Sequence, residues 1–381
     1  MQGVEEFRAE VRDWLAENLV GDFAALKGLG GPGREHEAFE ERRAWNQHLA
    51  QAGLTCLGWP VEHGGRGLSV AHRVAFYEEY AIANAPAKVN HFGEELLGPT
   101  LIAFGTPAQQ QRFLPRILDV TELWSQGYSE PGAGSDLANV STAAVLDDDE
   151  WVINGQKVWT SLAHWAQWCF VLARSEKGSK RHAGLSYLLV PLDQPGVEVR
   201  PIVQLTGDSE FNEVFFDDAR TDADLVVGQP GDGWRVAMGT LTFERGVSTL
   251  GQQIVYAREL SAVVELAKST GAADDPLIRE RLTRSWAGLR AMRSYALATM
   301  DVEQPGQDNV SKLLWANWHR DLGEIAMDVQ GKAGLVLAGG EFDDWQRLYL
   351  FTRADTIYGG SNEIQRNIIA ERVLGLPREA R

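Results

Sequence analysis

The chain has 381 residues, which is too long for one small hydrophobic core and favours two or three domains. Hydrophobic residues make up 44% of the sequence and charged residues 23%, a balance that argues against a disordered or fibrous chain. The formal net charge of -17 argues against a general nucleic-acid-binding protein, because phosphate contacts need a surplus of Lys and Arg.

The start of the chain and the cysteines narrow the class further. No apolar run approaches the length of a membrane span, and the chain begins with Glu5 and Glu6 where a targeting peptide would be basic. We therefore expect a cytoplasmic protein with no membrane partner. Cys56 and Cys169 lack a metal-binding spacing and the eight histidines form no close cluster, so we expect no metal site and two buried thiols.

The first third of the chain is predicted to be helical. Apolar residues recur at helical spacing from Val4 to Leu15, and the segments 37–52 and 70–85 show the same spacing. Between them, the run Gly28–Gly33 fits the GxGxxG spacing of a dinucleotide-binding fingerprint. No strand precedes this run and it contains Pro32, so we interpret it as a loop.

From about Trp124 the pattern changes to short strands rich in β-branched and aromatic residues, separated by turn signals. These segments are 151–153, 168–172, 185–190 and 213–216. The pair Asn154-Gly155 predicts a hairpin turn. After residue 228 helical periodicity returns in three long segments, near 234–268, 276–302 and 309–330. The predicted order is therefore helical, β and helical.

Two motifs in the β region carry groups that suit a ligand. The loop Ser129–Asp136 combines a hydroxyl, a carboxylate, Pro and two Gly, which lets the backbone approach a ligand closely, although a plain β-turn explains it equally well. About twenty residues later, the segment Gly155–Ser161 reads as a strand that presents an indole and two hydroxyls. The two motifs together are more specific than either alone.

Four segments in order along the chain resemble the signatures of acyl-CoA dehydrogenases. They are Trp59–Gly65, the EPGAGSD sequence that begins at Glu130, the NGxKxW strand from Asn154 and the tail Ile357–Arg366. The resemblance implies an α+β multidomain fold with FAD as cofactor. Its expected parts are an N-terminal helical domain at 1–120, a middle β-barrel domain at 121–228 and a C-terminal four-helix-bundle domain at 229–381.

The resemblance also implies which residues bind ligands. Five residues would surround the isoalloxazine of FAD, namely Gln126, Tyr128, Ser129, Trp159 and Ser161. Four more would reach FAD from a neighbouring subunit, with Gln330 and Gly334 along the pyrophosphate and Ser361 and Glu363 at the adenosine. Ser135 would meet the CoA pantetheine, and Tyr358 and Gly359 would lie beside the substrate.

The position of the catalytic base differs from the one that many family members use. Many family members carry a carboxylate directly after the tail tyrosine, where this chain has Gly359. A second family arrangement places the glutamate on the first long helix of the third domain, which Thr242–Gly246 matches, so Glu244 is the candidate. Its helical neighbours three and four positions away include no Lys or Arg, and burial there would raise its pKa towards a value useful for proton abstraction. A solvated surface glutamate is the alternative, and Arg245 would bind CoA.

The reaction implied by the resemblance is the dehydrogenation of an acyl-CoA to the trans-2-enoyl-CoA, with electrons passed to an electron-transferring flavoprotein. Glu244 would take the α-proton, and the β-hydrogen would leave as hydride to the flavin. The whole sequence further resembles actinobacterial dehydrogenases of steroid breakdown that act on propanoyl-CoA side chains of the C and D rings. Gly359 would favour such bulky acyl groups.

One departure from the family pattern leaves the assembly open. Family members usually carry Arg-x-x-Phe-Gly after the first long helix of the third domain, where this chain reads Ser269 to Pro276. The adenosine half of the FAD site is therefore in question, and both a homo-oligomer and a heteromer with a second acyl-CoA dehydrogenase subunit fit. Two other functions also fit: a flavin oxidase or monooxygenase on the same fold, and a partner subunit that completes another chain's flavin site.

Overall fold

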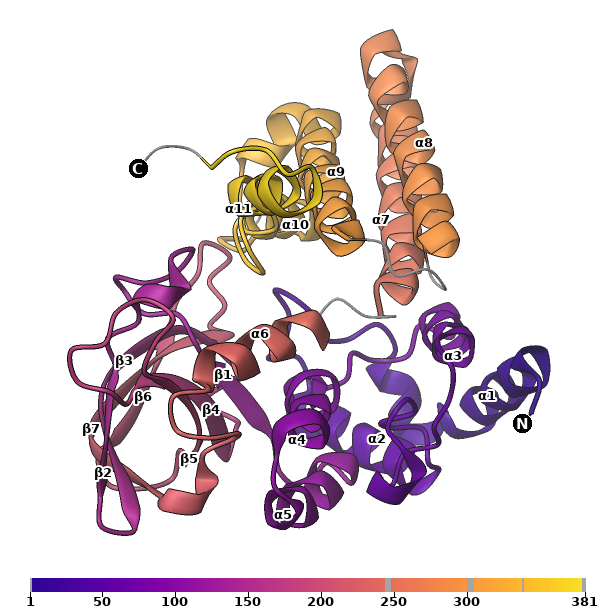
Figure 1. Cartoon of the computed structure of the whole chain (residues 1–381). Coiled ribbons are helices and arrows are strands. Elements are labelled where there is room, and N and C mark those ends of the chain that lie inside the picture. Colours follow the sequence, from indigo (N-terminus) through magenta and orange to yellow (C-terminus); the bar gives the residue numbers. More distant parts are fainter. Residues whose placement is uncertain (1, 244–247, 300–304, 338, 379–381) are drawn as a thin grey trace. The chain divides into compact units, whose positions relative to one another are not determined.

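The computed structural model describes residues 2–243, 248–299, 305–337 and 339–378 (Figure 1). The chain divides into two compact units. The sheet-bearing unit consists of residues 16–69 and 84–246, and the helical unit consists of residues 1–15, 70–83 and 247–381. The predicted order of helices, then strands, then helices along the chain is confirmed.

The sheet-bearing unit contains a curled sheet of seven strands. The strands are β1 (Trp124–Gly127), β2 (Ala143–Asp147), β3 (Glu150–Ser161), β4 (Trp168–Arg174), β5 (Leu185–Pro191), β6 (Val197–Ile202) and β7 (Phe211–Asp222). Their order is β1-β4-β2-β3-β7-β6, with β5 paired to β4. β1 runs parallel to β4, whereas β3, β7 and β6 pair in antiparallel fashion.

Four helices belong to the same unit. They are α2 (Phe39–Gln51), α4 (Gly98–Phe104), α5 (Pro107–Leu118) and α6 (Gly233–Phe243). α6 packs on β5 and β4, and Figure 1 shows it beside the strands. Thr106 and Gln109 cap the start of α5 reciprocally, with Pro107 in the first turn, where a missing N–H costs nothing. Phe113 of α5 meets the rings of Trp124 and Trp168, each at a centroid distance of 5.2 Å. These rings join α5 to β1 and β4 in one core.

The pair Asn154-Gly155 does not form the predicted hairpin turn. Both residues lie inside β3, where the pairing with β7 shifts register between Ile153 and Gly155, and the actual turn joins β2 to β3 around Asp148. A Cβ at Gly155 would lie 2.7 Å from the Cα of Thr142, so only glycine fits this close approach. The same turn-forming residues here serve a β-bulge.

The helical unit contains seven α-helices among its described residues. They are α1 (Val4–Asn18, whose first twelve residues belong to this unit), α3 (Val70–Ile82), α7 (Ser248–Thr270), α8 (Pro276–Thr299), α9 (Gln307–Gln330), α10 (Asp344–Thr352) and α11 (Asn362–Ile368). Their core is an apolar cluster that includes Tyr256, Val263, Trp318, Leu322 and Ile325. α9 contacts α7, α8, α10 and α11, so it is the central helix of this unit.

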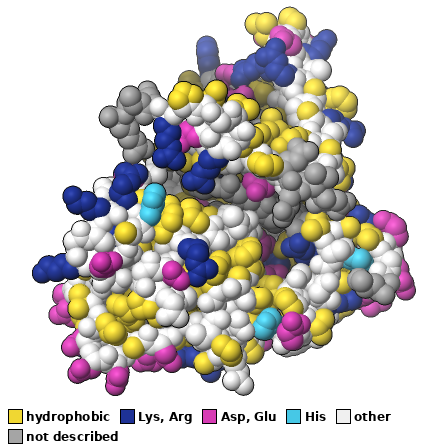
Figure 2. Space-filling model, in the orientation of Figure 1, with side chains coloured by type: hydrophobic (Ala, Val, Ile, Leu, Met, Phe, Trp, Pro, Cys, Tyr) yellow, Lys and Arg dark blue, Asp and Glu magenta, His cyan; other side chains and the backbone are white. Residues whose placement is uncertain are grey.

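The acidic surplus of the chain lies on the surface, where water solvates it. The end of β2 and the turn after it carry the exposed residues Asp147, Asp148 and Asp149, and Figure 2 shows acidic side chains gathered along this end of the sheet. Among the described residues, no helix has both the length and the apolar character that a membrane crossing requires. Cys56 and Cys169 are both buried free thiols, as predicted, and burial raises the pKa of Cys169 to about 12.

Candidate functional site

A bulge in β3 turns the indole of Trp159 outwards. The pairing of β3 with β7 shifts register between Lys157 and Thr160, and Trp159 adopts a left-handed backbone with φ of 60°. This conformation is strained for a bulky residue, by about 1–3 kcal/mol, and strained residues cluster at functional sites. The side chain of Trp159 is 57% exposed and meets Phe211 edge to face at 6.0 Å. The bulge therefore exposes an aromatic ring at the surface of this unit.

The loop Ser129–Asp136 is fixed to β3 by a buried ion pair. Lys157 donates from Nζ to the Glu130 carboxylate at 2.8 Å and to the carbonyl oxygens of Tyr128 and Leu172 at 3.1 and 2.7 Å. Glu130 also accepts the backbone N–H groups of Ser141 and Thr142. The loop itself is a tight turn in which Glu130 and Ala133 exchange two backbone hydrogen bonds of 3.0 Å.

Electrostatics hold the carboxylate of Glu130 in its charged form. Burial raises the pKa of Glu130, but the ammonium of Lys157 and the hydrogen bonds that the carboxylate accepts outweigh burial and lower the pKa to about 2. Burial lowers the pKa of Lys157. Sequence reasoning missed both residues. The available signal was the period-2 pattern of β3, which places Lys157 on the same inward face as Trp151 and Ile153 and so requires a buried acid as partner.

The other predicted flavin-binding residues of this unit lie beside that strand. The N–H of Val158 donates to the carbonyl oxygen of Ser129 at 2.9 Å, which brings Ser129 next to Trp159. Gln126 lies on β1, and its Nε2 is buried without a hydrogen-bonding partner among the described residues. A buried amide donor left without an acceptor is costly, so a ligand acceptor is expected there.

Three further residues complete this group. Tyr128 is 5% exposed and packs edge to face against Phe170 and Tyr187. Ser161 is half-buried at the end of β3, opposite Phe211, and Ser135 is exposed in the loop. The structure thus brings together an aromatic face, hydroxyls and an uncommitted amide donor, which is what a flat ring with polar edges requires.

The tail residues lie in the helical unit. Tyr358 donates its hydroxyl to Asp355 Oδ1 at 2.8 Å, and Gly359 has a left-handed backbone with φ of 61°. Within the described residues, no hydrogen bond engages the N–H of Gly359. Ser361 caps α11 by accepting the N–H of Ile364, and Glu363 is exposed in the first turn of that helix.

Gln330 is the last residue of α9, and Gly334 lies in the short 3-10 helix Gly331–Leu335 that follows it. Gln330 donates from Nε2 to Asp343 Oδ2 at 2.6 Å, and its buried Oε1 has no partner among the described residues. A Cβ at Gly334 would lie 2.7 Å from that Oε1, so the glycine allows the chain to fold closely against Gln330. The hydrogen-bonding partner of Gln330 is the cap of α10, not the tail.

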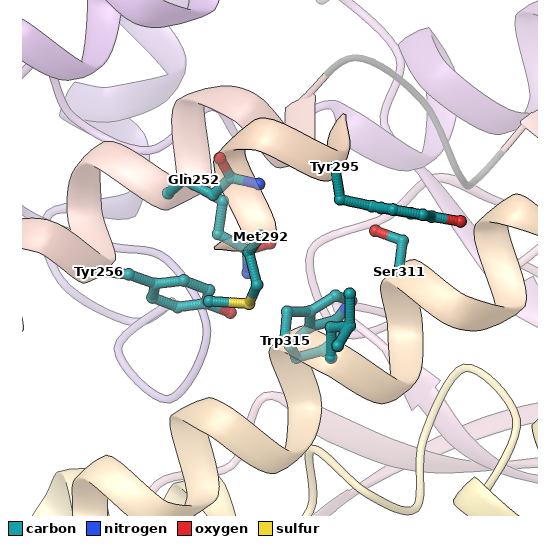
Figure 3. A pocket seen from close by; sticks show the side chains of 8 residues that line it. Gln252, Tyr256, Met292, Tyr295, Ser311 and Trp315 are labelled. Carbon is teal, nitrogen blue, oxygen red and sulfur yellow. The ribbon is translucent and has the colours of Figure 1, made fainter. Parts of the chain in front are cut away.

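A small pocket opens between α7, α8 and α9 near the tail. Gln252, Tyr256, Met292, Tyr295, Ser311 and Trp315 line it (Figure 3). The ring of Trp315 also lies 6.1 Å from the ring of Tyr358. The pocket therefore adjoins the loop that carries Tyr358 and Gly359, which we call the tail loop. Gln253 Oε1 and the Tyr256 hydroxyl, both from residues in the pocket wall, are buried without partners among the described residues.

Two of the predicted residues, Glu244 and Arg245, lie outside the described residues. Among the described residues, no group of three or more His, Cys, Asp or Glu side chains could hold a metal ion.

Family models match the chain along nearly its whole length. The acyl-CoA dehydrogenase N-terminal domain matches residues 2–121, the middle domain residues 125–219 and the C-terminal domain residues 231–374. The acyl-CoA dehydrogenase IpdE1 of Mycolicibacterium smegmatis is 87% identical over 99% of both chains, and IpdE1 of Mycobacterium tuberculosis is 85% identical over the full length of both.

Solved structures agree with these relatives. The Tcur3481-Tcur3483 steroid ACAD superposes with a TM-score of 0.84 and 30% identity, over 99% of this chain and 98% of that one. The ChsE4-ChsE5 complex from Mycobacterium tuberculosis superposes with a TM-score of 0.82 and 30% identity over the same shares. The chain therefore belongs to the acyl-CoA dehydrogenase family, whose members are FAD-dependent flavoenzymes.

Proposed function

We propose that the chain dehydrogenates an acyl-CoA thioester with a bulky, steroid-derived acyl group to the trans-2-enoyl-CoA. The observation that carries this proposal is the tail loop, where Gly359 follows Tyr358 and offers an N–H that no described acceptor engages. Glycine keeps the backbone donor and leaves space that a side chain would fill. The similarity to a steroid ACAD at 30% identity supports the class of acyl group.

The residues divide the chemistry between them. A hydrogen next to a thioester carbonyl is weakly acidic, so its removal needs a positioned base and donors for the oxygen that becomes negative. We assign the base to Glu244, from the sequence, and one donor to the N–H of Gly359. Tyr358 would lie beside the substrate, and Ser135 and Arg245 would bind CoA.

The face around Trp159 fits the flavin ring. When bound, FAD would supply the acceptor for the hydride that leaves the β-carbon. We assign the ring contacts to Gln126, Tyr128, Ser129, Trp159 and Ser161. The unpartnered Nε2 of Gln126 supports this assignment, because a ring carbonyl or nitrogen would supply the missing acceptor. Gln330, Gly334, Ser361 and Glu363 would contact the remainder of an FAD bound by a neighbouring subunit.

Around this site we propose three domains, at 1–120, 121–228 and 229–381, in a cytoplasmic enzyme that passes electrons to an electron-transferring flavoprotein. We also propose a heteromer with a second acyl-CoA dehydrogenase subunit. The names of both similar solved structures pair two proteins, and residues 269–276 lack the family's Arg-x-x-Phe-Gly.

The acyl specificity can be measured by anaerobic mixing. The FAD-loaded protein is combined with butyryl-CoA, octanoyl-CoA, palmitoyl-CoA and a propanoyl-CoA ester carrying a fused two-ring steroid fragment, and bleaching of the flavin is followed. We expect the ring-bearing ester to reduce the flavin at least about tenfold faster than the straight chains, because one well-filled apolar pocket gives discrimination of this order. Equal rates for all four esters would contradict the steroid-derived substrate, and no bleaching by any ester would remove the dehydrogenase assignment.

The assembly can be measured by the FAD content of the chain expressed alone. We expect clearly less than one FAD per chain, because the site would lack residues from its partner subunit. Co-expression with a second acyl-CoA dehydrogenase subunit is expected to raise the content. A homo-oligomer with full FAD occupancy would show that this chain needs no different partner.

A further inference from the structure

A buried series of hydrogen-bonded charged side chains contacts the tail loop, and the proposed mechanism does not use it. His319 of α9 is hydrogen-bonded through both ring nitrogens, with Nδ1 2.8 Å from Asp355 Oδ2 and Nε2 3.0 Å from Glu259 Oε2. The other oxygen of Asp355 accepts the hydroxyl of Tyr358. The side chains of His319 and Asp355 are only 9% and 1% exposed. A continuous series of contacts therefore runs from Glu259 of α7 through His319 of α9 to Asp355 and the tail loop.

The imidazole in this series is positively charged at neutral pH. Burial opposes the charge, but the hydrogen bonds to Asp355 and Glu259 outweigh it and raise the pKa of His319 to about 9. Both ring nitrogens are then donors, which matches two carboxylate acceptors. The ring of Tyr256 lies 4.5 Å from that of His319 and packs against the imidazole.

Lys312 adds a second contact from the same helix. Its Nζ donates to the backbone oxygen of Asp355 at 2.7 Å and lies 4.4 Å from the centre of the Tyr358 ring. It also lies 4.0 Å from the centre of the Trp315 ring. α9 thus holds both the backbone at Asp355 and the aromatic ring of Tyr358.

The other side of the loop is held by α11. Gln365 donates from Nε2 to the carbonyl oxygens of Gly359 and Gly360, at 3.0 and 3.1 Å. Asn309 fixes Gln365 in turn, by donating to its Oε1 at 2.6 Å. The N–H of Gly359 lies between this anchor and the Tyr358 anchor.

We propose that Asp355 is a positioning residue, which through the hydroxyl of Tyr358 orients the N–H of Gly359 towards the substrate's thioester oxygen. This inference rests on the role of Gly359 in the proposed function. Gly359 and Gly360 both have positive φ, and glycine has the widest backbone freedom, so an untethered loop would not hold one donor direction. A donor improves the rate only when it is already aimed at the oxygen as its charge develops.

Hydrogen exchange on the FAD-loaded protein tests the tether without any substrate. Tyr358→Phe removes only the hydroxyl, and Asp355→Asn keeps an acceptor for it but removes the charge that faces His319. We expect each change to speed exchange of segment 353–361 by roughly threefold or more, with Tyr358→Phe having little effect elsewhere. The matched control is Lys268→Gln, which breaks an exposed ion pair of α7 with Glu265 and leaves the loop untouched. Exchange equal to wild type in Tyr358→Phe would overturn the tether.

Flavin reduction tests the consequence. With the best ester from the panel, we expect Tyr358→Phe to slow reduction about tenfold while the half-saturating concentration changes less than about twofold, because a misaimed donor acts on the transition state. Asp355→Asn is expected to retain more activity than Asp355→Ala, since the amide oxygen still accepts the hydroxyl. A rate equal to wild type in Tyr358→Phe, or a loss that only follows lost FAD, would overturn the positioning role. If no ester reduces the wild-type flavin, the proposed function fails, and the exchange result alone decides whether the loop is tethered.

Discussion

Glu244→Gln is expected to slow reduction of the flavin by acyl-CoA by roughly 10²–10⁴-fold, the usual contribution of a positioned general base. Gln has nearly the shape of Glu but cannot accept the α-proton. FAD content and the affinity for the acyl-CoA are expected to stay close to wild type, because the change removes a reacting group and little volume. Anaerobic stopped-flow bleaching measures the rate, and titration of the flavin spectrum measures the binding.

The matched control is Glu265→Gln, which removes an exposed glutamate of α7 that pairs with Lys268. We expect this variant to reduce its flavin at the wild-type rate. Undiminished bleaching in Glu244→Gln would show that another group takes the proton. Under air, an oxidase or monooxygenase that does not abstract an α-proton would turn over normally in Glu244→Gln, so the same variant separates the dehydrogenase from oxygen-using flavin enzymes of that kind.

Long elements with a clear period could be predicted from the sequence. The buried strands β4 and β5 are largely apolar, and α9 repeats its apolar positions over 24 residues. The strands β1, β2 and β6 were not predicted individually. β1 has only four residues, too few to show a period. β6 alternates from Val197 to Arg200, but it is short and contains Pro201, which argues against a strand. The misplaced turn at Asn154 has a different cause, because the backbone freedom of Asn-Gly suits a bulge as well as a hairpin.

In the candidate site, too, local motifs could be predicted from the sequence, whereas contacts between distant segments could not. The loop from Ser129 and the strand carrying Trp159 are local motifs, so residue types alone made them candidates for a ligand site, and the resemblance to the family implied their role. The contact of His319 with Asp355 joins residues 36 positions apart on different elements, and only the packing of α9 against the tail brings them together. The role of Lys157 stands between these cases, because its inward position follows from the strand period while its partner Glu130 does not.

Lys157→Met is expected to destabilise the protein by about 3–5 kcal/mol at pH 7, because it leaves the carboxylate of Glu130 buried without its cation. The double variant Glu130→Gln with Lys157→Met is expected to recover part of this loss, since neither side chain then carries a charge. Lys268→Met, at an exposed ion pair, is expected to change stability by less than about 1 kcal/mol. Urea unfolding followed by tryptophan fluorescence measures all three.

The contribution of this ion pair to the stability of the protein depends on pH. The pKa of Glu130 is about 2 in the folded protein against an ordinary value of 4.5, so its contribution to stability is fully present above pH 4.5. It is lost as the pH falls from 4.5 towards 2, by about 3 kcal/mol in all. Without Lys157 the folded pKa rises and this loss shrinks. The difference in stability between wild type and Lys157→Met is therefore expected to narrow from pH 5 to pH 3, and a constant difference would show that the ion pair does not account for the stability of the loop.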